Sequence, residues 1–248
     1  MHSDGSIGIG GGTLSLVAGD DGVHAEQTLE VRAGALAVEA VEGLEATDIA
    51  ISGGTVDVTA SDDGINAAGG ATTTATTGGG GMGGGEQDTG ETLVISGGTV
   101  RVAGAGDGLD SNGTIAITGG DITVSGPTGG GQGAVDANGT ITVDGGTLAV
   151  SGSVLRTAEG AQGWVAASVT GSAGDTVEVT DASGTVIASF TALADFASVF
   201  SSADGITAGQ TYTVTVAGAG SATATAGVAL ATEMGAGPGG GGTRPPRP

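Results

Sequence analysis

Acidic and amide side chains recur at a fixed interval near the N-terminus of the chain. Three segments each place an acid before a glycine, an aliphatic residue after it and then a polar residue: Asp21–Ala25, Glu42–Ala46 and Asp63–Ala67. Their glycines are 21 residues apart both times, and the pattern returns at Asp107–Ser111 and, more weakly, at Ala134–Ala137. We call these five segments the acidic turns and number them in chain order. A fixed period of this length indicates a solenoid, in which each period forms one coil.

Stacked coils would bring the acidic turns together in columns. Equivalent residues of successive coils in a parallel β-solenoid lie about 4.8 Å apart. One predicted column contains Asp21, Glu42, Asp63 and Asp107, and the other contains His24, Glu45, Asn66, Asp110 and Asp136. Carboxylates at this spacing repel each other by about 3 to 4 kcal/mol at an effective dielectric near 20. No lysine or arginine occurs in these columns, so we expect a bound cation to neutralise them.

The types of donor in the columns favour calcium. Carboxylate and amide oxygens without cysteine are the ligands that Ca²⁺ prefers, and Ca²⁺ tolerates irregular coordination shells. The predicted ligands are Asp20, Asp21, Glu42, Glu45, Asp62, Asp63, Asn66, Asp107, Asp110 and Asp136. The third turn has the fullest set, whereas His24 is a poor ligand for a hard cation and is interpreted as a surface residue. The alternative is that the acids only keep an edge soluble and prevent sheet pairing.

Short apolar stretches surround the acidic turns and define the elements that position them. Each period contains two alternating apolar stretches, separated by a glycine turn such as Gly53–Thr55 or Gly97–Thr99, and a single aliphatic residue within the acidic turn. This alternation is typical of strands with one buried face. Three short strands per coil and about six coils predict an all-β fold, a parallel β-helix with a core of stacked Ile, Val and Leu.

The regular period ends after Ser151, and the composition changes there. All five aromatic residues lie in the following segment, between Trp164 and Tyr212, which has its own strand patterns. These predict a small antiparallel β cap at the C-terminal end of the solenoid, where an uncovered coil would leave an exposed sheet edge. The predicted organisation is a β-helix at 1–157 with a Gly/Thr-rich insertion at 68–90, an antiparallel module at 158–232, and a disordered tail or linker at 233–248.

Composition limits the possible partners. The 248 residues carry a formal net charge of −22, with five arginines and no lysine. Nucleic acid and anionic membranes are therefore unfavourable partners. The sequence has no cysteine, no apolar stretch long enough to span a membrane, and no signal peptide at its first residues.

Other residues that could do chemistry have simpler explanations. Trp164 and Tyr212 could stack on sugars, but as members of the aromatic cluster they are expected in the core of the cap. Arg101 aligns with Asp57 of the preceding coil, which predicts an ion pair, and Arg32 has Glu30 two residues away on the same strand face.

Several motifs together resemble one family. The Gly-Gly-Thr turns, the segment Ser61–Ala67, the Gly/Met-rich insertion, the segment Asp107–Gly113 and the segment Gly209–Val214 resemble bacterial carbohydrate-binding domain-containing β-helix proteins related to pectate lyases. The resemblance spans most of residues 5–218. It implies a right-handed β-helix, Ca²⁺ bound by the acidic turns, and attachment outside the cell, or on its surface, to a polysaccharide such as a polygalacturonate-like chain or cellulose.

Three functions remain open at this stage. The first is a non-catalytic calcium-dependent polysaccharide-binding module. The second is a pectate-lyase-like enzyme, which would need a basic side chain to remove a proton; the chain offers no lysine and only Arg32, Arg101 and Arg156 in or near the helix. The third is a structural or adhesive solenoid in which bound ions contribute stability alone. The sequence does not indicate an oligomeric state.

Overall fold

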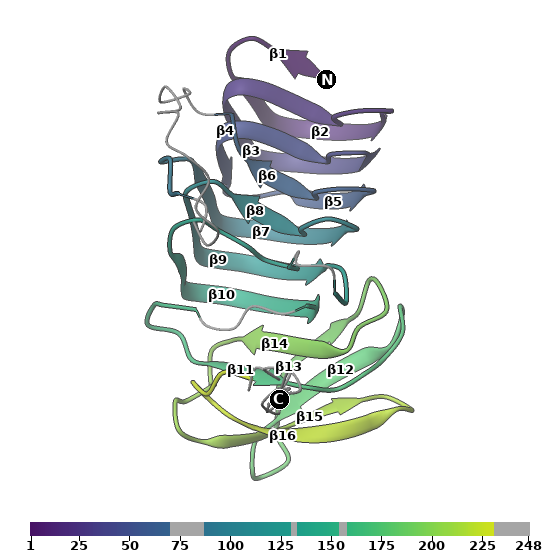
Figure 1. The fold of residues 1–248 in the computed structure, drawn as a ribbon, viewed down its shortest axis with the longest axis vertical. Helices are drawn as coiled ribbons and strands as arrows, with labels where there is room; N and C mark the ends of the chain where they lie inside the picture. Colours follow the sequence, from purple (N-terminus) through teal and green to yellow (C-terminus); the bar gives the residue numbers. More distant parts are fainter. Residues whose placement is uncertain (70–86, 130–132, 154–157, 231–248) are drawn as a thin grey trace, which may run out of the picture.

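The structure is a computed structural model that describes residues 1–69, 87–129, 133–153 and 158–230. It is an all-β fold in which a parallel β-helix of about six turns is followed by antiparallel strands (Figure 1). Most of the expected insertion at 68–90, the expected tail at 233–248 and Arg156 lie outside the described residues. No helix in the described ranges has the length and hydropathy needed to cross a membrane.

The strands of the β-helix form three faces that repeat from coil to coil. They are β1 (His2–Ser3), β2 (Ile7–Val17), β3 (Val23–Ala40), β4 (Leu44–Ile51), β5 (Thr55–Ala60), β6 (Ile65–Ala67), β7 (Thr92–Gly104), β8 (Leu109–Ser111), β9 (Thr114–Ser125) and β10 (Ile141–Gly152). The longer strands bend around corners, so that β3 pairs in parallel with β1, β2, β4 and β5 along its length. The shortest face carries β1, the start of β3 and of β4, then β6 and β8, and this is the face of the acidic turns.

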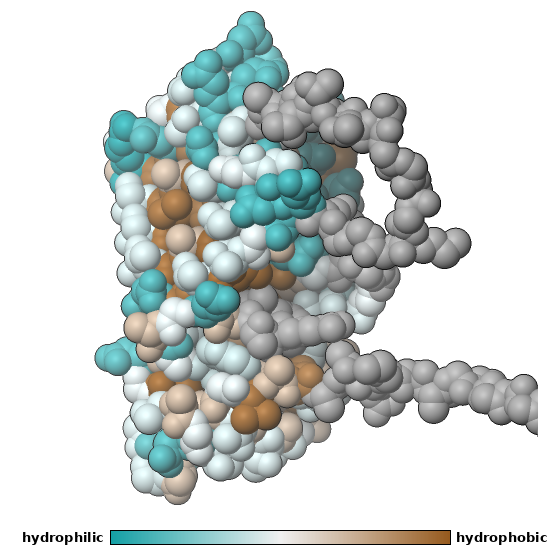
Figure 2. Space-filling view, turned by 60° about the vertical axis from the view of Figure 1, so that its left-hand side comes forward, coloured by the Kyte–Doolittle hydropathy of each residue, from teal (hydrophilic) through white to brown (hydrophobic). Residues whose placement is uncertain are grey.

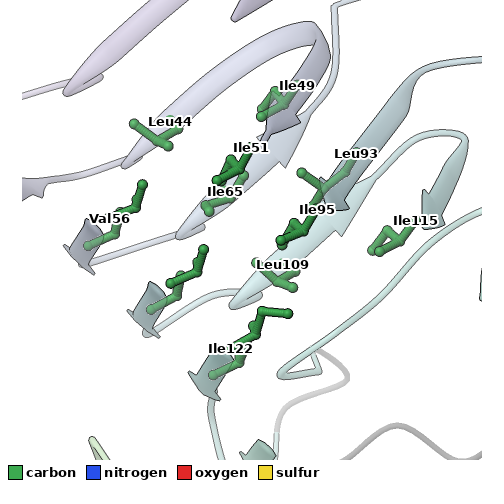
Figure 3. Close-up of a cluster of buried hydrophobic side chains, with 14 of the residues drawn as sticks. Leu44, Ile49, Ile51, Val56, Ile65, Leu93, Ile95, Leu109, Ile115 and Ile122 are labelled. Carbon is green, nitrogen blue, oxygen red and sulfur yellow. The ribbon is translucent and has the colours of Figure 1, made fainter. Parts of the chain in front are cut away.

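The core consists of aliphatic columns, as the sequence predicts. Leu29, Ile49, Leu93 and Ile115 are successive register partners, and each is at most 1% exposed. Figure 3 shows such side chains pointing inward from consecutive coils. Burial of one such side chain stabilises the fold by about 1.5 to 3 kcal/mol. These columns hold the coils in a single register and thereby fix the acidic turns above one another.

Glycine has two different roles in the coils. The second glycine of each Gly-Gly corner, such as Gly54 with φ of +83°, adopts the left-handed conformation that side chains disfavour. The glycine of an acidic turn does not have a positive φ. It is required there because a side chain would collide with the neighbouring coil. A Cβ on Gly43 would lie 2.2 Å from the Gly64 carbonyl oxygen and 2.3 Å from Val58 Cγ1. The glycine turns were expected from the sequence, whereas the close approach at the glycines of the acidic turns was not.

The C-terminal strands divide into two groups, where the sequence analysis expected one small sheet. They are β11 (Trp164–Ala167), β12 (Thr176–Thr180), β13 (Val186–Thr191), β14 (Ser198–Ser202), β15 (Thr211–Val216) and β16 (Gly220–Thr225). β14 pairs antiparallel with β10 and with β11, so both extend the sheet of the solenoid. The remaining four form a separate antiparallel sheet in the order β13-β12-β15-β16. Without β14, the backbone N–H and C=O groups on the outer edge of β10 would lack hydrogen-bond partners, and β14 supplies these partners.

The aromatic residues follow the same division. Trp164 stacks on Phe200 with ring centroids 5.2 Å apart, and both belong to the core of the solenoid. Phe190, Phe196 and Tyr212 belong to a second core, beneath the four-stranded sheet. The Tyr212 hydroxyl accepts a hydrogen bond from the Thr207 N–H and donates one to the Gly205 carbonyl. The expectation that Trp164 and Tyr212 are buried is confirmed, but Trp164 belongs to the solenoid core and only Tyr212 to the core of the cap.

Candidate functional site

The acidic turns stack in the register that the 21-residue period predicts. His24, Glu45, Asn66 and Asp110 are successive register partners on β3, β4, β6 and β8. Asp136 continues this column, because its N–H donates to the Leu109 carbonyl and Val135 bridges Leu109. At the opposite end His2 is the partner of His24. Hydrophilic residues gather at this N-terminal end of the molecule (Figure 2).

The other column is held by backbone hydrogen bonds between coils. The N–H groups of Gly22, Gly43 and Gly64 donate to the carbonyls of Glu42, Asp63 and Asp107, respectively. Asp20 and Asp62 lie just outside this column and are exposed, and the Gly106 N–H donates to the Asp62 carbonyl.

Two of the column acids also bond to the next coil through their side chains. Asp63 Oδ1 accepts a hydrogen bond from the Asp107 N–H at 2.7 Å, and Asp107 Oδ1 accepts one from the Gly133 N–H at 2.5 Å. These carboxylates therefore contribute to coil stacking as well as to the charge of the column. This contribution was not predicted from the sequence, because the repeat does not specify the direction of these side chains.

Three carboxylates converge at the fourth and fifth acidic turns. Ligand oxygens of Asp107, Asp110 and Asp136 all lie within 4.8 Å of one another, and we call these residues the C-terminal group. Asp107 and Asp110 are half-buried, whereas Asp136 is exposed. From the sequence, the fullest ligand set was expected at the third turn. In the structure the three carboxylates converge at the fourth and fifth turns instead.

The electrostatics of the C-terminal group favour protonation when no cation is present. Burial, followed by the charges of Asp107, Asp63 and Asp136, raises the pKa of Asp110 to about 7. Burial also raises the pKa of Asp107 to about 6, and the charges of Asp63, Asp136 and Asp62 contribute, although the Gly133 N–H opposes the change. A bound cation would remove the cost of holding these carboxylates ionised.

The third acidic turn lies between the second turn and the fourth turn, which contributes to the C-terminal group. Asn66 Oδ1 and Glu42 Oε2 are buried atoms without a hydrogen-bond partner among the described residues. Burial raises the pKa of Glu42, and the charges of Glu45, Asp21 and Asp63 add to this effect. Burial similarly raises the pKa of Asp63. Buried oxygens without a partner, placed among crowded carboxylates, are donors that a cation could use.

A second convergence lies at the first and second turns and contains the imidazole. Ligand atoms of Asp21, His24 and Glu45 lie within 4.8 Å of one another, and we call these residues the N-terminal group. His24 Nδ1 is 2.7 Å from Glu45 Oε2 and 3.1 Å from Asp21 Oδ2. Burial lowers the pKa of His24, but the hydrogen bond and charge of Glu45, together with Glu26 and Asp21, outweigh burial and raise it.

His24 is therefore not the simple surface residue that the sequence analysis expected. Its side chain is only 20% exposed, and its position in the ladder places it beside the carboxylate of the following coil. The register could be predicted from the period, but the hydrogen bonds of the imidazole ring depend on side-chain directions that the period does not specify.

The described arginines lie away from both groups. Arg32 pairs with Glu30, as expected. Arg101 is the register partner of Asp57, but the two side chains form no ion pair within 4.0 Å, so the expected pair is not present. Arg101 lies on the face formed by β5 and β7. Arg32 comes directly after Val31, the last residue of β3 that pairs with β4. The acidic turns occupy the remaining face.

Comparison with known families agrees with a carbohydrate-binding solenoid. Residues 1–83 match the model of a family described as carbohydrate-binding domain-containing protein. The match covers about a third of the chain and includes the first three acidic turns. No curated protein and no solved structure matches the chain. The match supports carbohydrate binding, and the all-β solenoid fits that function.

Proposed function

We propose that this protein is a non-catalytic, calcium-dependent carbohydrate-binding solenoid that acts outside the cell on an acidic polysaccharide. The observation that carries the proposal is the convergence of Asp107, Asp110 and Asp136 in a chain whose N-terminal third matches a carbohydrate-binding family. The first three acidic turns, which lie within the matched residues, share one face of the β-helix with the C-terminal group.

The residues present fit Ca²⁺. The C-terminal group supplies three carboxylates, and the adjacent Asn66 has a buried amide oxygen without a partner. Such a set of hard oxygen donors at irregular angles suits a cation that accepts six to eight ligands. No arginine lies within the described part of these turns to neutralise the charge. When bound, Ca²⁺ would supply positive charge and coordination positions that an external ligand can fill.

The distribution of aromatic rings supports recognition of sugar through an ion. Sugar-binding proteins commonly stack rings on sugar faces, but all five aromatic residues of this chain are at most 8% exposed. The exposed face of the acidic turns instead offers carboxylates. A neutral sugar has little to gain there, whereas a uronate carboxylate can complete the coordination of a bound Ca²⁺. This reasoning favours a polygalacturonate-like chain over cellulose.

Retention on immobilised polysaccharide tests the proposal. The full chain should be retained on polygalacturonate in millimolar Ca²⁺ and released by EDTA, with little retention on cellulose. Asp110→Asn should weaken retention. Asp57→Asn is the matched control, because it removes one charge from an exposed position on β5, on another face. Equal retention in Ca²⁺ and in EDTA would show that the ion takes no part.

A structural role for the same ions is the second candidate. It is favoured by the side-chain bonds of Asp63 and Asp107 to backbone N–H groups of the next coil, because these bonds show that the acids already hold coils together. This candidate predicts that Ca²⁺ raises the melting temperature while the protein passes through every polysaccharide column. No observation favours lyase activity, since neither described arginine adjoins the acidic turns.

A further inference from the structure

We propose that the N-terminal group is a separate site for a transition-metal ion of intermediate softness, with Zn²⁺ as the representative ion. The group consists of His24, Asp21 and Glu45, and it shares no residue with the C-terminal group. The inference does not depend on calcium or carbohydrate binding elsewhere on the molecule.

The geometry of the three side chains suits a small ion. His24 Nδ1 lies 2.7 Å from Glu45 Oε2 and 3.1 Å from Asp21 Oδ2, and all three ligand atoms lie within 4.8 Å of one another. A tetrahedral ion with bonds of about 2.0 to 2.2 Å holds its ligand atoms roughly 3.3 Å apart. Small side-chain rotations would therefore bring these atoms into the coordination shell. Three protein ligands would leave one position open, as in zinc sites that bind water or substrate.

The neighbours of His24 orient its ring for this role. The other ring nitrogen, Nε2, lies 3.5 Å from Glu26 Oε1. A carboxylate behind a ligating imidazole fixes the ring orientation and strengthens the nitrogen as a ligand. The ring of His2 stacks on that of His24 at 4.9 Å between centroids and shields one ring face.

A fourth carboxylate adds negative charge beside the group. Glu42 is partly buried, and burial together with the charges of Glu45 and Asp21 raises its pKa, although a hydrogen bond with the Asn66 side chain opposes this change. A metal ion bound by the group would offset part of this charge.

The donor set distinguishes this group from the rest of the acidic turns. Imidazole suits Zn²⁺, Cu²⁺ and Ni²⁺, whereas carboxylate and carbonyl oxygens suit Ca²⁺ and Mg²⁺. The column that supplies oxygen ligands at Glu45, Asn66, Asp110 and Asp136 supplies a nitrogen only at its N-terminal end. The two ends of one column would therefore select different classes of metal.

Metal titration of the full chain tests the proposal. Protein freed of metal by chelation and then dialysed into millimolar Ca²⁺ is titrated with Zn²⁺ by calorimetry, and with Co²⁺ by visible absorption. Wild type should bind one Zn²⁺ despite the excess Ca²⁺, and Co²⁺ should give the absorption of a low-symmetry site. His24→Gln, which keeps a polar side chain but removes the imidazole, should weaken Zn²⁺ binding at least tenfold, and Glu45→Gln should also weaken it.

Three variants serve as controls in the same titration. Asp110→Asn and Asp57→Asn should bind Zn²⁺ like wild type, because they lie outside the N-terminal group. His2→Gln should also retain binding, and retention by His24→Gln with loss in His2→Gln would overturn the assignment. Failure of wild type to bind Zn²⁺ in the presence of Ca²⁺ would overturn the proposal as a whole. Circular dichroism of each variant shows whether a loss reflects unfolding.

Discussion

At the scale of single residues, Asp110 has the least favourable position of the carboxylates in the acidic turns. It is half-buried, it faces Asp107 and Asp136, and its pKa is raised to about 7 from an ordinary value of 3.8. An acid whose pKa is raised on folding stabilises the folded state only while it holds its proton. Its ionisation near neutral pH therefore opposes folding, unless a cation is bound.

This position predicts a pH dependence in the absence of metal. Between pH 4 and 7 the folded chain holds a proton on Asp110 that the unfolded chain has lost, so the free energy of unfolding should fall as pH rises through this window. The pKa of His24 is also raised, so the free energy of unfolding should also fall as pH rises above 6.5. Denaturant unfolding in EDTA at a series of pH values measures the slope. Asp110→Asn should flatten it and Asp57→Asn should not; a free energy that rises with pH across this window would contradict the prediction.

The same residue predicts how calcium affects thermal stability. A ligand at a hundredfold excess over its Kd stabilises the folded state by about 2.7 kcal/mol, which raises Tm by roughly 5 to 10 °C for a chain of this size. Wild type should show such a gain in millimolar Ca²⁺ relative to EDTA. Asp110→Asn should lose most of the gain, yet melt no lower than wild type in EDTA because one repelling charge is removed. Identical melting of wild type in both buffers would rule out a calcium site here.

Sequence periodicity was sufficient to predict which residues of the acidic turns lie beside one another. His24, Glu45 and Asn66 are partners because 21 residues return the chain to the same place on the coil, and Asp110 joins them after one period plus an insertion. The side-chain bonds of Asp63 to the Asp107 N–H and of His24 to Glu45 were not predictable in this way. They depend on rotamers and on the small offset between coils, which a repeat length does not encode.

At the scale of the elements, the glycine of each acidic turn determines how closely the coils stack. A methyl group on Gly43 would meet the Gly64 carbonyl oxygen at 2.2 Å, and rigid backbone cannot yield as a side chain would. Gly43→Ala is therefore expected to destabilise the fold by about 1 to 3 kcal/mol, as overpacking does in other cores. Chemical denaturation measures the change in the free energy of unfolding.

Gly10→Ala is the matched control for this substitution. Gly10 lies on the exposed side of β2, and a Cβ there would have no atom within 4 Å. Its replacement should change the free energy of unfolding by less than about 1 kcal/mol, since alanine mainly restricts the unfolded chain. If both variants are equally stable, close packing does not explain the glycines of the acidic turns.

The elements of the solenoid were more predictable from sequence than those that follow it. Alternating apolar residues and Gly-Gly corners occur locally, and the period fixes which strands are neighbours, so β3, β4, β5 and β7 follow directly. The pairing of β14 with β10 has no local signal, because it joins residues about 50 positions apart in antiparallel register. The last strand, β16, was missed because its alternating small residues, Gly220–Thr225, lack an aliphatic or aromatic pattern.

At the scale of the whole molecule, Trp164 and Phe200 close the end of the solenoid core. Phe200 is fully buried and lies on β14, the strand that pairs with the last coil. Removing its ring should cost about 3 to 5 kcal/mol. Because Trp164 is the single tryptophan and stacks on this ring, its fluorescence reports the junction, whereas far-UV circular dichroism reports all the strands.

The two signals give a test of how the parts unfold. In wild type the fluorescence and dichroism transitions should coincide, because the junction belongs to the solenoid core. In Phe200→Ala the fluorescence transition should occur at lower denaturant than the dichroism transition. Val186→Ala, at a 47% exposed position of the four-stranded sheet, should leave both transitions in place. Coincident transitions in Phe200→Ala would show that the ring does not hold the junction.

Because β14 pairs with β10 alone among the coil strands, the number of coils in the solenoid can change without affecting how its C-terminal end is covered. β14 contacts only the last coil, and every earlier coil meets its neighbours through the same parallel ladder. The stretch from Gly43 to Asp63 is one full period, so its removal would join Glu42 to Gly64 and present equivalent residues to both neighbours. The molecule would become shorter by about 4.8 Å with both ends unchanged. Coils of this kind can be gained or lost as units, and each one would add or remove one rung of acidic ligands.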